Sequence, residues 1–277
     1  QPAGRYTSSN PNLLAQPTRT SLGRRIRYGY IAGGGCNLGA WDLDQIEMRI
    51  TAHESEDEAL TAIFMDSDRH FHKETCHKIY GTPINQIDKG STEYKMSKNI
   101  SFGILYGISA YGLKLQLEQR GQKVSRSDCQ KWIEEWFSIS PGVFSFMEWK
   151  KAEARNKGYV SDMWGRIRYF PGVHSPISNV REEALRQVMN HPIQSGAQGV
   201  IKAAQAVIWR DILPYLWRDG IYCECVLQIH DELLFEFEQG LERLMDPVIN
   251  SVMATAVELK VPVASSGNWG KNWGALK

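Results

Sequence analysis

The sequence lacks any long apolar run, and this absence limits the class of protein it encodes. No stretch reaches the roughly 18 consecutive apolar residues that a membrane-spanning helix needs. The first residues, QPAGRYTSSNPN, are polar and begin without methionine, so they predict no secretory signal peptide and indicate a processed or trimmed fragment. With 277 residues, 42% hydrophobic and 23% charged, the chain is expected to be a globular protein of one large domain or two intertwined ones.

The sequence also lacks a paired set of cysteines. Its five cysteines are Cys36, Cys76, Cys129, Cys223 and Cys225. Only the last two lie close together, and no second Cys or His pair accompanies them. This spacing argues against a zinc site and a disulfide framework, and it predicts reduced thiols in an intracellular protein.

Acidic residues are absent from residues 1–41, although the whole chain has a net charge of only +1. That segment carries five arginines: Arg5, Arg19, Arg24, Arg25 and Arg27. It is also rich in Ser, Thr and Asn and is broken by prolines. One interpretation is an irregular basic strip that binds anions, and the alternative is a solvated, partly disordered tail.

The hydrophobic pattern predicts strands near both ends of the chain and helices between them. The stretch GYIAGGGCNLGAWDLDQIEMRITAH indicates a strand, a Gly-rich turn, a second strand and a helix from about Gln45. The other expected elements are helices over about 57–158 with breaks at 81–83 and 140–142, a hairpin over 158–172, a helix over 178–217 interrupted near Pro192, strands at 222–229, 232–237 and 261–269, and a helix over 241–259. We therefore expect an α+β fold whose sheet is closed by distant segments.

Two carboxylates are expected at strand ends of this sheet. Asp231 lies with Glu232 inside the apolar run CVLQIHDELLFEF, and Asp42 ends the predicted strand LGAWD. Burying neighbouring carboxylates is unfavourable unless something compensates their charge. Two Mg²⁺ ions could do so, because hard cations prefer carboxylate and phosphate oxygens. The alternative for the first strand end is structural, with Asp42 or Asp44 serving as a helix N-cap.

A second candidate set follows helical spacing in EYKMSKNISFGILYGISAYG. Lys98, Phe102 and Tyr106 recur every four residues, so on a helix they share one face. A cation followed by two aromatic rings suits a nucleoside triphosphate, and Gly103 and Gly107 permit a close approach from outside the helix. The alternative is an ordinary amphipathic helix with its aromatic side chains in the core.

A third set has the same spacing further along the chain. Arg186, Asn190 and Gln194 place hydrogen-bond donors on one helical face. Such donors can reach minor-groove acceptors that all base pairs share, which predicts duplex binding without sequence preference. The alternative is a solvated polar face.

Together the three sets resemble the polymerase region of family A DNA polymerases, of the DNA polymerase I type. DLDQIEMRI is similar to motif A of that family, usually written DYSQIELR. KNISFGILYG is similar to motif B and QIHDE to motif C. The resemblance extends over essentially the whole chain, and the segments IQSGAQG and GNWGKNWGALK look closer to phage replicative members than to bacterial repair enzymes.

The resemblance implies a fold and an activity. The fold would be an antiparallel palm sheet formed by residues 1–50 and 181–277, which carries the catalytic carboxylates, with a mainly helical fingers subdomain at 51–180. The thumb and any 3′–5′ exonuclease domain, which members place upstream, would be absent. The activity would be template-directed, two-metal transfer of deoxynucleotides to a primer 3′-hydroxyl.

The resemblance also implies roles for individual residues. Asp42 and Asp231 would bind two Mg²⁺ ions, for which Mn²⁺ can substitute, with Glu232 beside them. Glu47 would crowd a ribose 2′-hydroxyl, and Lys98 would bind the triphosphate and protonate the leaving pyrophosphate. The other nucleotide-binding residues would be His72, Lys95, Phe102 and Tyr106, and the primer–template would contact Arg5, Arg186, Asn190, Gln194, Gln228 and His230.

Three departures from the family pattern affect these roles. Tyr94 stands where motif B usually has arginine, and the neighbouring Lys95 would be a substitute without the bidentate geometry of a guanidinium. Leu43 and Asp44 replace the usual Tyr and Ser of motif A, so a further negative charge would lie near the metals. The dipeptide Leu14–Ala15 replaces polar residues in the primer-binding segment and should weaken the grip on DNA.

The expected partners follow from the resemblance: primer–template DNA, deoxynucleoside triphosphates, and an upstream thumb or exonuclease segment or a processivity factor, with no membrane. The expected location is the cytoplasm of a bacterium or of a phage-infected cell, with an organelle as the alternative. Two other functions compete with catalysis by this chain. One is a non-catalytic or thumb-dependent primer–template binding fragment, and the other is a single-subunit RNA polymerase.

Overall fold

The computed structural model describes residues 2–17 and 20–276, so Arg19 of the basic strip lies outside the described residues. The chain divides into two compact units, which we treat separately. The first comprises Gln1–Glu47 and Ser195–Lys277, and the second comprises Met48–Gln194. Strands and helices occur together and the sheets are antiparallel, which confirms the predicted α+β class. In the described part of the chain, no helix combines the length and apolarity needed to cross a membrane.

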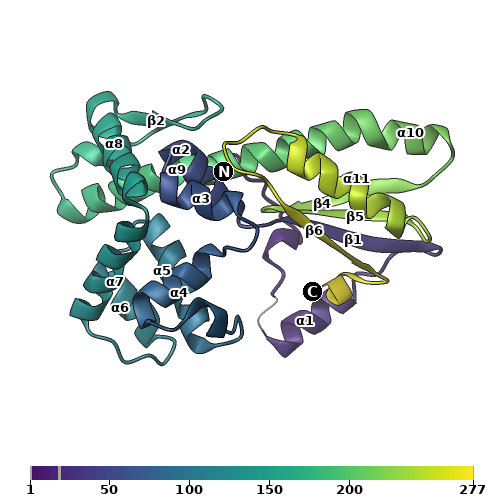
Figure 1. Ribbon diagram of the computed structural model, residues 1–277. Helices are drawn as coiled ribbons and strands as arrows, with labels where there is room; N and C mark the ends of the chain where they lie inside the picture. The colour runs from purple at the N-terminus through teal and green to yellow at the C-terminus, as the bar shows by residue number, and fades with distance from the viewer. Residues whose placement is uncertain (1, 18–19, 277) are drawn as a thin grey trace. The chain divides into compact units, whose positions relative to one another are not determined.

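The first unit is built on a four-stranded sheet with the order β4-β5-β1-β6 (Figure 1). All its neighbouring strands run antiparallel. The strands are β1 (Cys36–Leu43), β4 (Cys223–Ile229), β5 (Glu232–Glu238) and β6 (Ser265–Gly270). The second strand of the predicted pair near the N-terminus is therefore β1, whereas the first is reduced to an isolated bridge between Ile31 and Asn272.

Alternation along β1 divides the sheet into two buried faces. Trp41 is fully buried, contacts Phe235 and Phe237 edge-on or tilted, and donates a hydrogen bond from Nε1 to Asp246 of α11 (Glu242–Thr255) at 3.0 Å. On the opposite face, Leu38 and Ala40 join a separate apolar cluster. Figure 1 shows α10 (Leu213–Arg218) and α11 on one side of this sheet and α1 (Ser21–Tyr28) on the other. Asp42 follows Ala40 by two residues and so belongs to the α1 side.

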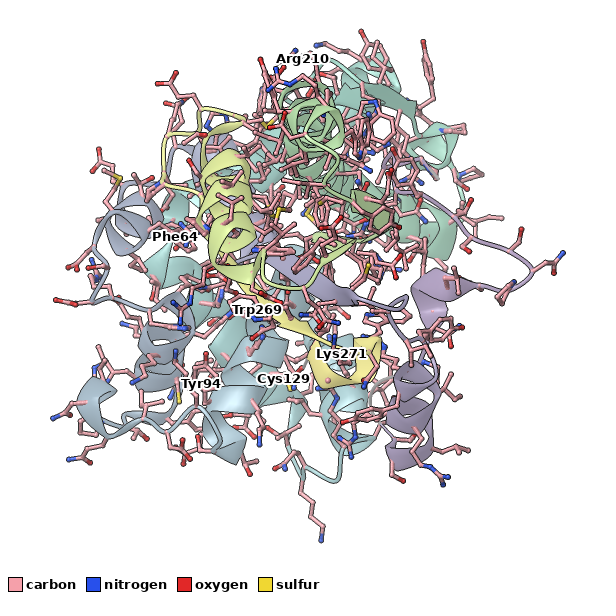
Figure 2. The ribbon with its side chains drawn as sticks, turned by 90° about the vertical axis from the view of Figure 1, so that its right-hand side faces the viewer. Phe64, Tyr94, Cys129, Arg210, Trp269 and Lys271 are labelled. Atoms are coloured by element: carbon pink, nitrogen blue, oxygen red, sulfur yellow. The ribbon has the colours of Figure 1, made fainter. Side chains whose placement is uncertain are left out.

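The remaining elements of the first unit are helices and single helical turns. They are a 3₁₀ turn at Leu13–Ala15, α1 (Ser21–Tyr28), a π-helical turn at Ile208–Ile212, α10 (Leu213–Arg218), α11 (Glu242–Thr255) and a 3₁₀ turn at Trp273–Leu276. Thr20 caps α1 by accepting a hydrogen bond from Gly23 N at 3.0 Å. The prediction of an irregular strip is therefore wrong for residues 21–28, where a capped helix carries three of the five arginines. At the other end of the sheet, Lys271 comes directly after β6, two residues beyond Trp269 (Figure 2). Its Nζ donates a hydrogen bond to the carbonyl oxygen of Cys36 at 3.1 Å.

The second unit is mainly helical. Its elements are most of α2 (Ile46–Ser55), α3 (Glu58–Met65), α4 (Phe71–Tyr80), a 3₁₀ turn at Ile84–Gln86, α5 (Thr92–Leu105), α6 (Ala110–Glu118), α7 (Arg126–Ile139), α8 (Pro141–Lys157), the hairpin β2 (Tyr159–Ser161) and β3 (Ile167–Tyr169), a 3₁₀ turn at Pro171–His174, and the first part of α9 (Ser178–Val207). The predicted helices over 57–158 and the predicted hairpin are thus confirmed.

Trp136 is a central packing residue of the second unit. Its side chain is fully buried and donates a hydrogen bond from Nε1 to Ser101 Oγ of α5 at 3.2 Å. The ring also packs edge-on against Phe71 of α4, with centroids 5.8 Å apart. Asp57 ties distant helices together, because its carboxylate accepts from Leu60 N and from Gly142 N, both at 2.7 Å.

The predicted interruption near Pro192 does not occur, because α9 runs through this proline. Proline inside a helix removes one backbone hydrogen bond and costs about 3 kcal/mol. The apolar residues around it, including Val188, Ile193 and Ala197, are buried. Burial of this stretch favours the continuous helix, which ends at Val207 and continues as the π-helical turn. The predicted strand over 261–269 is also displaced, since β6 begins only at Ser265.

Candidate active site

Strand register brings the two predicted aspartates to one end of the sheet. Asp42, the penultimate residue of β1, pairs with Glu232, the first residue of β5. The backbone N–H of Leu43 donates to the carbonyl of Asp231 at 3.1 Å. Residues paired in this way lie about 5 Å apart at their Cα atoms. The prediction that Asp42 and Asp231 occupy strand ends of one sheet is therefore confirmed, and Glu232 lies with them.

The turns next to these carboxylates have unusual backbone geometry. Ile229 pairs with Glu232, so His230 and Asp231 alone connect β4 to β5. His230 has φ = 56° and Gln45, in the turn after β1, has φ = 52°. Left-handed backbone at residues other than glycine costs about 1 kcal/mol or more and concentrates at functional sites. The carbonyl of His230 accepts a hydrogen bond from Gln228 Nε2 at 3.1 Å, which supports the turn.

An arginine lies close to this acidic cluster. Arg27 of α1 is 7% exposed, and its guanidinium stacks on Trp273 at 4.2 Å from the ring centroid. Burial lowers the pKa of Arg27, and the charge of Glu232 opposes this effect. The sequence places Arg27 in a basic strip but carries no signal that this residue lies close enough to Glu232 to feel its charge. This proximity depends on how α1 packs against the sheet.

The carboxylates fit hard divalent cations rather than a closed metal site. Among residues 2–17 and 20–276, no group of three or more His, Cys, Asp or Glu side chains could hold a metal ion by itself. Mg²⁺ is commonly bound through one or two carboxylates, with water and substrate phosphates completing its coordination. Asp42 and Asp231 are both half-buried and supply carboxylate oxygens of this kind. The donor set therefore suits Mg²⁺ in the presence of a phosphate ligand.

Glu47, the second residue of α2, forms an ion pair within the first unit. Its Oε1 accepts a hydrogen bond from Arg5 Nη2 at 2.9 Å, and the two side chains are 12% and 27% exposed. Asp44 lies in the preceding turn, where it is exposed and accepts from Ser266 Oγ at 3.4 Å. A predicted DNA-binding residue, Arg5, thus contacts the predicted sugar-selecting residue, which the sequence did not indicate.

In the second unit, Lys98, Phe102 and Tyr106 lie along one face of α5 and its C-cap. Lys98 Nζ is 6.0 Å from the centroid of the Phe102 ring, and the Phe102 and Tyr106 centroids are 6.5 Å apart. Lys98 is exposed and Tyr106 is 36% exposed. The predicted alignment is confirmed, and the cation is accessible to an anionic ligand.

The glycines of this segment make room for side chains of the same unit. A Cβ at Gly103 would lie 3.0 Å from Ile108 Cγ2, and a Cβ at Gly107 would collide with Met189 Cε. Gly107 also has φ = 70°, in the left-handed region. The groups that approach these two glycines closely are therefore the side chains of Ile108 and Met189.

His72 is buried in an aromatic cluster, with 1% of its surface exposed. Its ring centroid is 5.7 Å from that of Phe102 and 6.3 Å from that of Tyr94. Within the described residues, neither ring nitrogen has a hydrogen-bond partner. Burial lowers the pKa of His72 to about 3, with smaller contributions from His70 and Lys98. The imidazole is therefore neutral at neutral pH.

Tyr94, which stands where the family usually has arginine, is also part of this cluster. It is 8% exposed, and its hydroxyl lies 3.5 Å from His70 Nε2, a weak contact. Burial raises the pKa of Tyr94. Lys95, the proposed substitute, is exposed next to it. Tyr94 thus contributes packing rather than charge, and the positive charge at this point comes from Lys95 and Lys98.

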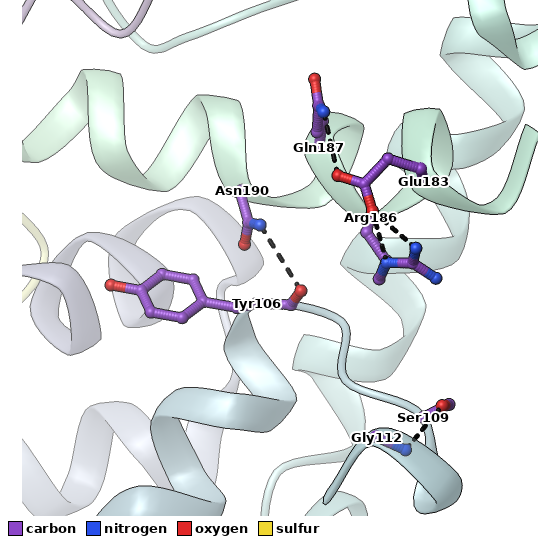
Figure 3. Close-up of polar contacts among 7 residues, drawn as sticks. All are labelled: Tyr106, Ser109, Gly112, Glu183, Arg186, Gln187 and Asn190. Atoms are coloured by element: carbon purple, nitrogen blue, oxygen red, sulfur yellow. Dashed lines mark hydrogen bonds and ion pairs between the residues drawn. The ribbon is translucent and has the colours of Figure 1, made fainter. Parts of the chain in front are cut away.

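The donors on α9 are already engaged within the second unit (Figure 3). Arg186 donates from Nη2 to Glu183 at 2.5 Å, and Gln187 donates to the same carboxylate at 3.0 Å. The hydrogen bond from Gln187, followed by that from Arg186, lowers the pKa of Glu183. Asn190 Nδ2 donates to the backbone carbonyl of Tyr106 at 3.4 Å. Gln194, one turn further, is half-buried. The structure therefore links the predicted DNA-binding face of α9 to the end of α5.

The two units divide the predicted site residues between them. The first contains Arg5, Asp42, Glu47, Gln228, His230, Asp231 and Glu232, and the second contains His72, Lys95, Lys98, Phe102, Tyr106, Arg186, Asn190 and Gln194. Strand pairing brings residues of the first set together, and helical spacing aligns residues of the second.

Comparison with known proteins identifies relatives over nearly the whole chain. The family model described as DNA polymerase family A matches residues 2–275. DNA polymerase I of Pseudomonas aeruginosa is 35% identical over 270 residues, covering 98% of this chain and 28% of that protein. The thermostable DNA polymerase I of Thermus aquaticus is 36% identical over 270 residues, covering 96% of this chain and 31% of that protein.

A solved structure has the same fold. The POL domain of Pol1 from M. smegmatis, in complex with DNA primer-template and dNTP, matches with a TM-score of 0.89 and 34% identity, covering 100% of this chain and 47% of that one. The named relatives are bacterial, so the predicted leaning toward phage members is not supported. The chain spans less than a third of the two curated relatives named above. Its match to the family model nevertheless extends almost from end to end, and the chain belongs to DNA polymerase family A.

Proposed function

We propose that this chain is the catalytic region of a DNA-directed DNA polymerase, which adds deoxynucleotides to a primer under the direction of a template. The observation that carries the proposal is the pairing of β1 with β5, which places Asp42, Asp231 and Glu232 at one end of the sheet. Family membership and the likeness to a polymerase domain solved with primer-template and dNTP support it. In this proposal the first unit is the palm and the second is the fingers.

Asp42 and Asp231 would hold two Mg²⁺ ions, or Mn²⁺ in their place. When bound, the ions neutralise charge on the reacting phosphates, which is the main requirement of phosphoryl transfer. Glu232 would lie beside the primer terminus, where Arg27 balances part of the acidic charge. The strained turn at His230 fixes the direction in which Asp231 points.

The incoming nucleotide would bind along α5. Lys98 is exposed on this helix and would contact the triphosphate, with Lys95 as a second cation and Phe102 packing on the sugar. Tyr106 would lie at the templating position. His72 is 1% exposed and packs against Phe102, so as a neutral ring it would support Phe102 from beneath rather than make the predicted direct contact with the nucleotide.

The primer–template would be held by donors from both units. In the first unit these are Arg5, Gln228 and His230, and Glu47 would exclude nucleotides that carry a 2′-hydroxyl. In the second unit they are Arg186, Asn190 and Gln194, and the present hydrogen bonds of Arg186 and Asn190 would exchange for contacts with DNA. The expected partners are primer–template DNA, deoxynucleoside triphosphates and further polymerase segments or a processivity factor.

Primer extension on a mixed-sequence template tests the proposal. Wild-type chain with Mg²⁺ and the four deoxynucleotides should produce a complementary product, and Asp231→Ala should abolish it. Asp219→Ala is the matched control, because Asp219 is an exposed acid of the same unit that, among residues 2–17 and 20–276, forms an ion pair with its neighbour Arg218. Extension that persists in the Asp231 variant would contradict the proposal. Salt-sensitive duplex binding without any extension would favour the binding-fragment alternative.

A further inference from the structure

We propose that Lys202 is a positioning residue for sugar selection, because it holds the segment Gly4–Tyr6 so that Arg5 orients Glu47. This inference rests on the proposed function, in which Glu47 excludes nucleotides that carry a 2′-hydroxyl. All the residues involved belong to the first unit. Lys202 lies on the last part of α9, far from the N-terminal segment in sequence.

The first step is the contact between Lys202 and the N-terminal segment. Lys202 Nζ donates to the carbonyl oxygen of Gly4 at 2.6 Å. The same ammonium lies 4.4 Å from the centroid of the Tyr6 ring, within cation–π range. Lys202 therefore grips the residue before Arg5 and the residue after it.

The backbone conformation of Gly4 determines how Arg5 leaves this contact. Gly4 has φ = 73°, a left-handed conformation that lets the chain turn immediately before Arg5. With its two neighbours held, Arg5 extends its guanidinium to Glu47 and donates from Nη2 at 2.9 Å. Half-burial of both partners reduces screening by solvent relative to an exposed pair.

The second step concerns what Arg5 does to Glu47. A glutamate side chain has several rotatable bonds, and a gate that rejects one extra hydroxyl must stay within a fraction of an ångström of one position. A single charge-assisted hydrogen bond from a fixed guanidinium restricts this freedom. Loss of the Lys202 grip would leave the Arg5–Glu47 pair chemically intact but free to shift, so discrimination should fall more than basal synthesis.

The test measures incorporation of a matched deoxynucleotide and of its ribonucleotide, and takes the ratio of the two kcat/KM values. Lys202→Met should lower this ratio about tenfold, as expected for loss of one charged hydrogen bond. Lys202→Arg should restore it, because a guanidinium can also donate to the Gly4 carbonyl and stack on Tyr6. Arg5→Gln provides a second route to the same loss if Lys202→Met fails to fold.

Two comparisons separate a positioning role from general damage. In a Glu47→Ala background, Lys202→Met should change the ratio by less than about twofold, because its effect passes through Glu47. Arg210→Met is the matched control, since Arg210 is an exposed cation just beyond α9 (Figure 2) that, within the described part of the chain, forms an ion pair with its neighbour Asp211. That variant should keep the wild-type ratio.

The possible failures are distinguishable. A folded Lys202→Met chain that extends primers with the full wild-type ratio overturns the positioning role and leaves the proposed function intact. An equal loss of discrimination in the Glu47→Ala background also overturns it, since Lys202 would then act by another route. A wild-type chain that extends no primer with either nucleotide overturns both proposals.

Discussion

The two units assemble their candidate site residues in different ways. In the first unit, Asp42 and Asp231 are distant in sequence and meet only because β1 pairs with β5. In the second unit, Lys98, Phe102 and Tyr106 meet because a single helix repeats about every four residues. The acidic set therefore depends on long-range register, whereas the cation–aromatic set depends on local geometry.

This difference affects how each set responds to damage. A slip of one residue in β1 would turn Asp42 to the opposite face of the sheet. A helix has no equivalent failure, because its faces are fixed by its own backbone hydrogen bonds. When the core of the first unit is weakened, we therefore expect Asp42 and Asp231 to separate. When the core of the second unit is weakened, α5 should shift as a whole while Lys98 and Phe102 stay aligned along it.

The largest expected effects come from the buried tryptophans of the two units. Trp41→Ala and Trp136→Ala should each lower the free energy of unfolding by about 3–5 kcal/mol, since both side chains are fully buried. Hydrogen exchange should then show lost protection of β1 and β5 in the first variant, and of α4, α5 and α7 in the second. Uniform loss over both units in either variant would contradict this expectation and show that the two units unfold together.

Next in size is the effect of the cations on α5. Lys98→Met should lower kcat/KM for a deoxynucleotide by about 100-fold, equivalent to about 2.7 kcal/mol. Lys95→Met should cost less than about tenfold, because Lys95 lies about two helical turns from Phe102, whereas Lys98 lies one turn away with its Nζ 6.0 Å from the ring centroid. Single-turnover incorporation measures both losses. Equal losses would show that proximity to Phe102 carries no special role.

Gly107 allows a comparison of backbone strain with steric clash. Gly107→Ala should destabilise the second unit by about 2–3 kcal/mol, because an alanine would both adopt φ = 70° and collide with Met189. Gly121→Ala is the control, since Gly121 has φ = 82° but nothing within 4 Å of an added Cβ, and it should cost about 1 kcal/mol. Thermal unfolding distinguishes the two, and Met189→Ala in the Gly107→Ala background should recover part of the difference.

Measured per pH unit, the smallest expected effect is the pH dependence that His72 imposes. Its pKa of about 3 in the folded chain lies below the ordinary value of 6.5, so the unfolded chain binds an extra proton between these values. Stability should therefore fall as the pH is lowered, by roughly 1.4 kcal/mol per pH unit below 6.5 from this group. His72→Phe should flatten the acid side of the curve by that amount in urea unfolding. An unchanged slope would show that His72 titrates normally.

Much of the second unit could be predicted from sequence because its signals are local. Helical spacing placed Lys98, Phe102 and Tyr106 on one face, and the hairpin at 158–172 was recognised from its turn residues. The burial of His72 could not be predicted, because it depends on Tyr94 and Phe102 packing over it from another helix. The continuous helix through Pro192 could not be predicted either, because burial of the surrounding residues outweighs the local helix-breaking effect of proline.

In the first unit, sequence reasoning identified the carboxylates but not their surroundings. The strand ends carrying Asp42 and Asp231 were recognisable from the apolar runs beside them. The contact of Arg5 with Glu47 and the approach of Arg27 to Glu232 joined segments with no shared pattern. Such contacts depend on how loops and helices pack on the sheet, which periodicity does not encode.

The central claim is that β1 and the β4–β5 turn supply one catalytic centre rather than two independent acids. A double-mutant cycle of Asp42→Asn and Asp231→Asn, read by single-turnover incorporation of one deoxynucleotide, tests it most directly. If the carboxylates act as a unit, each single change should remove nearly all incorporation, and the double change should lose little more than either. Incorporation that survives Asp42→Asn, or losses that multiply as for separate sites, would contradict this account.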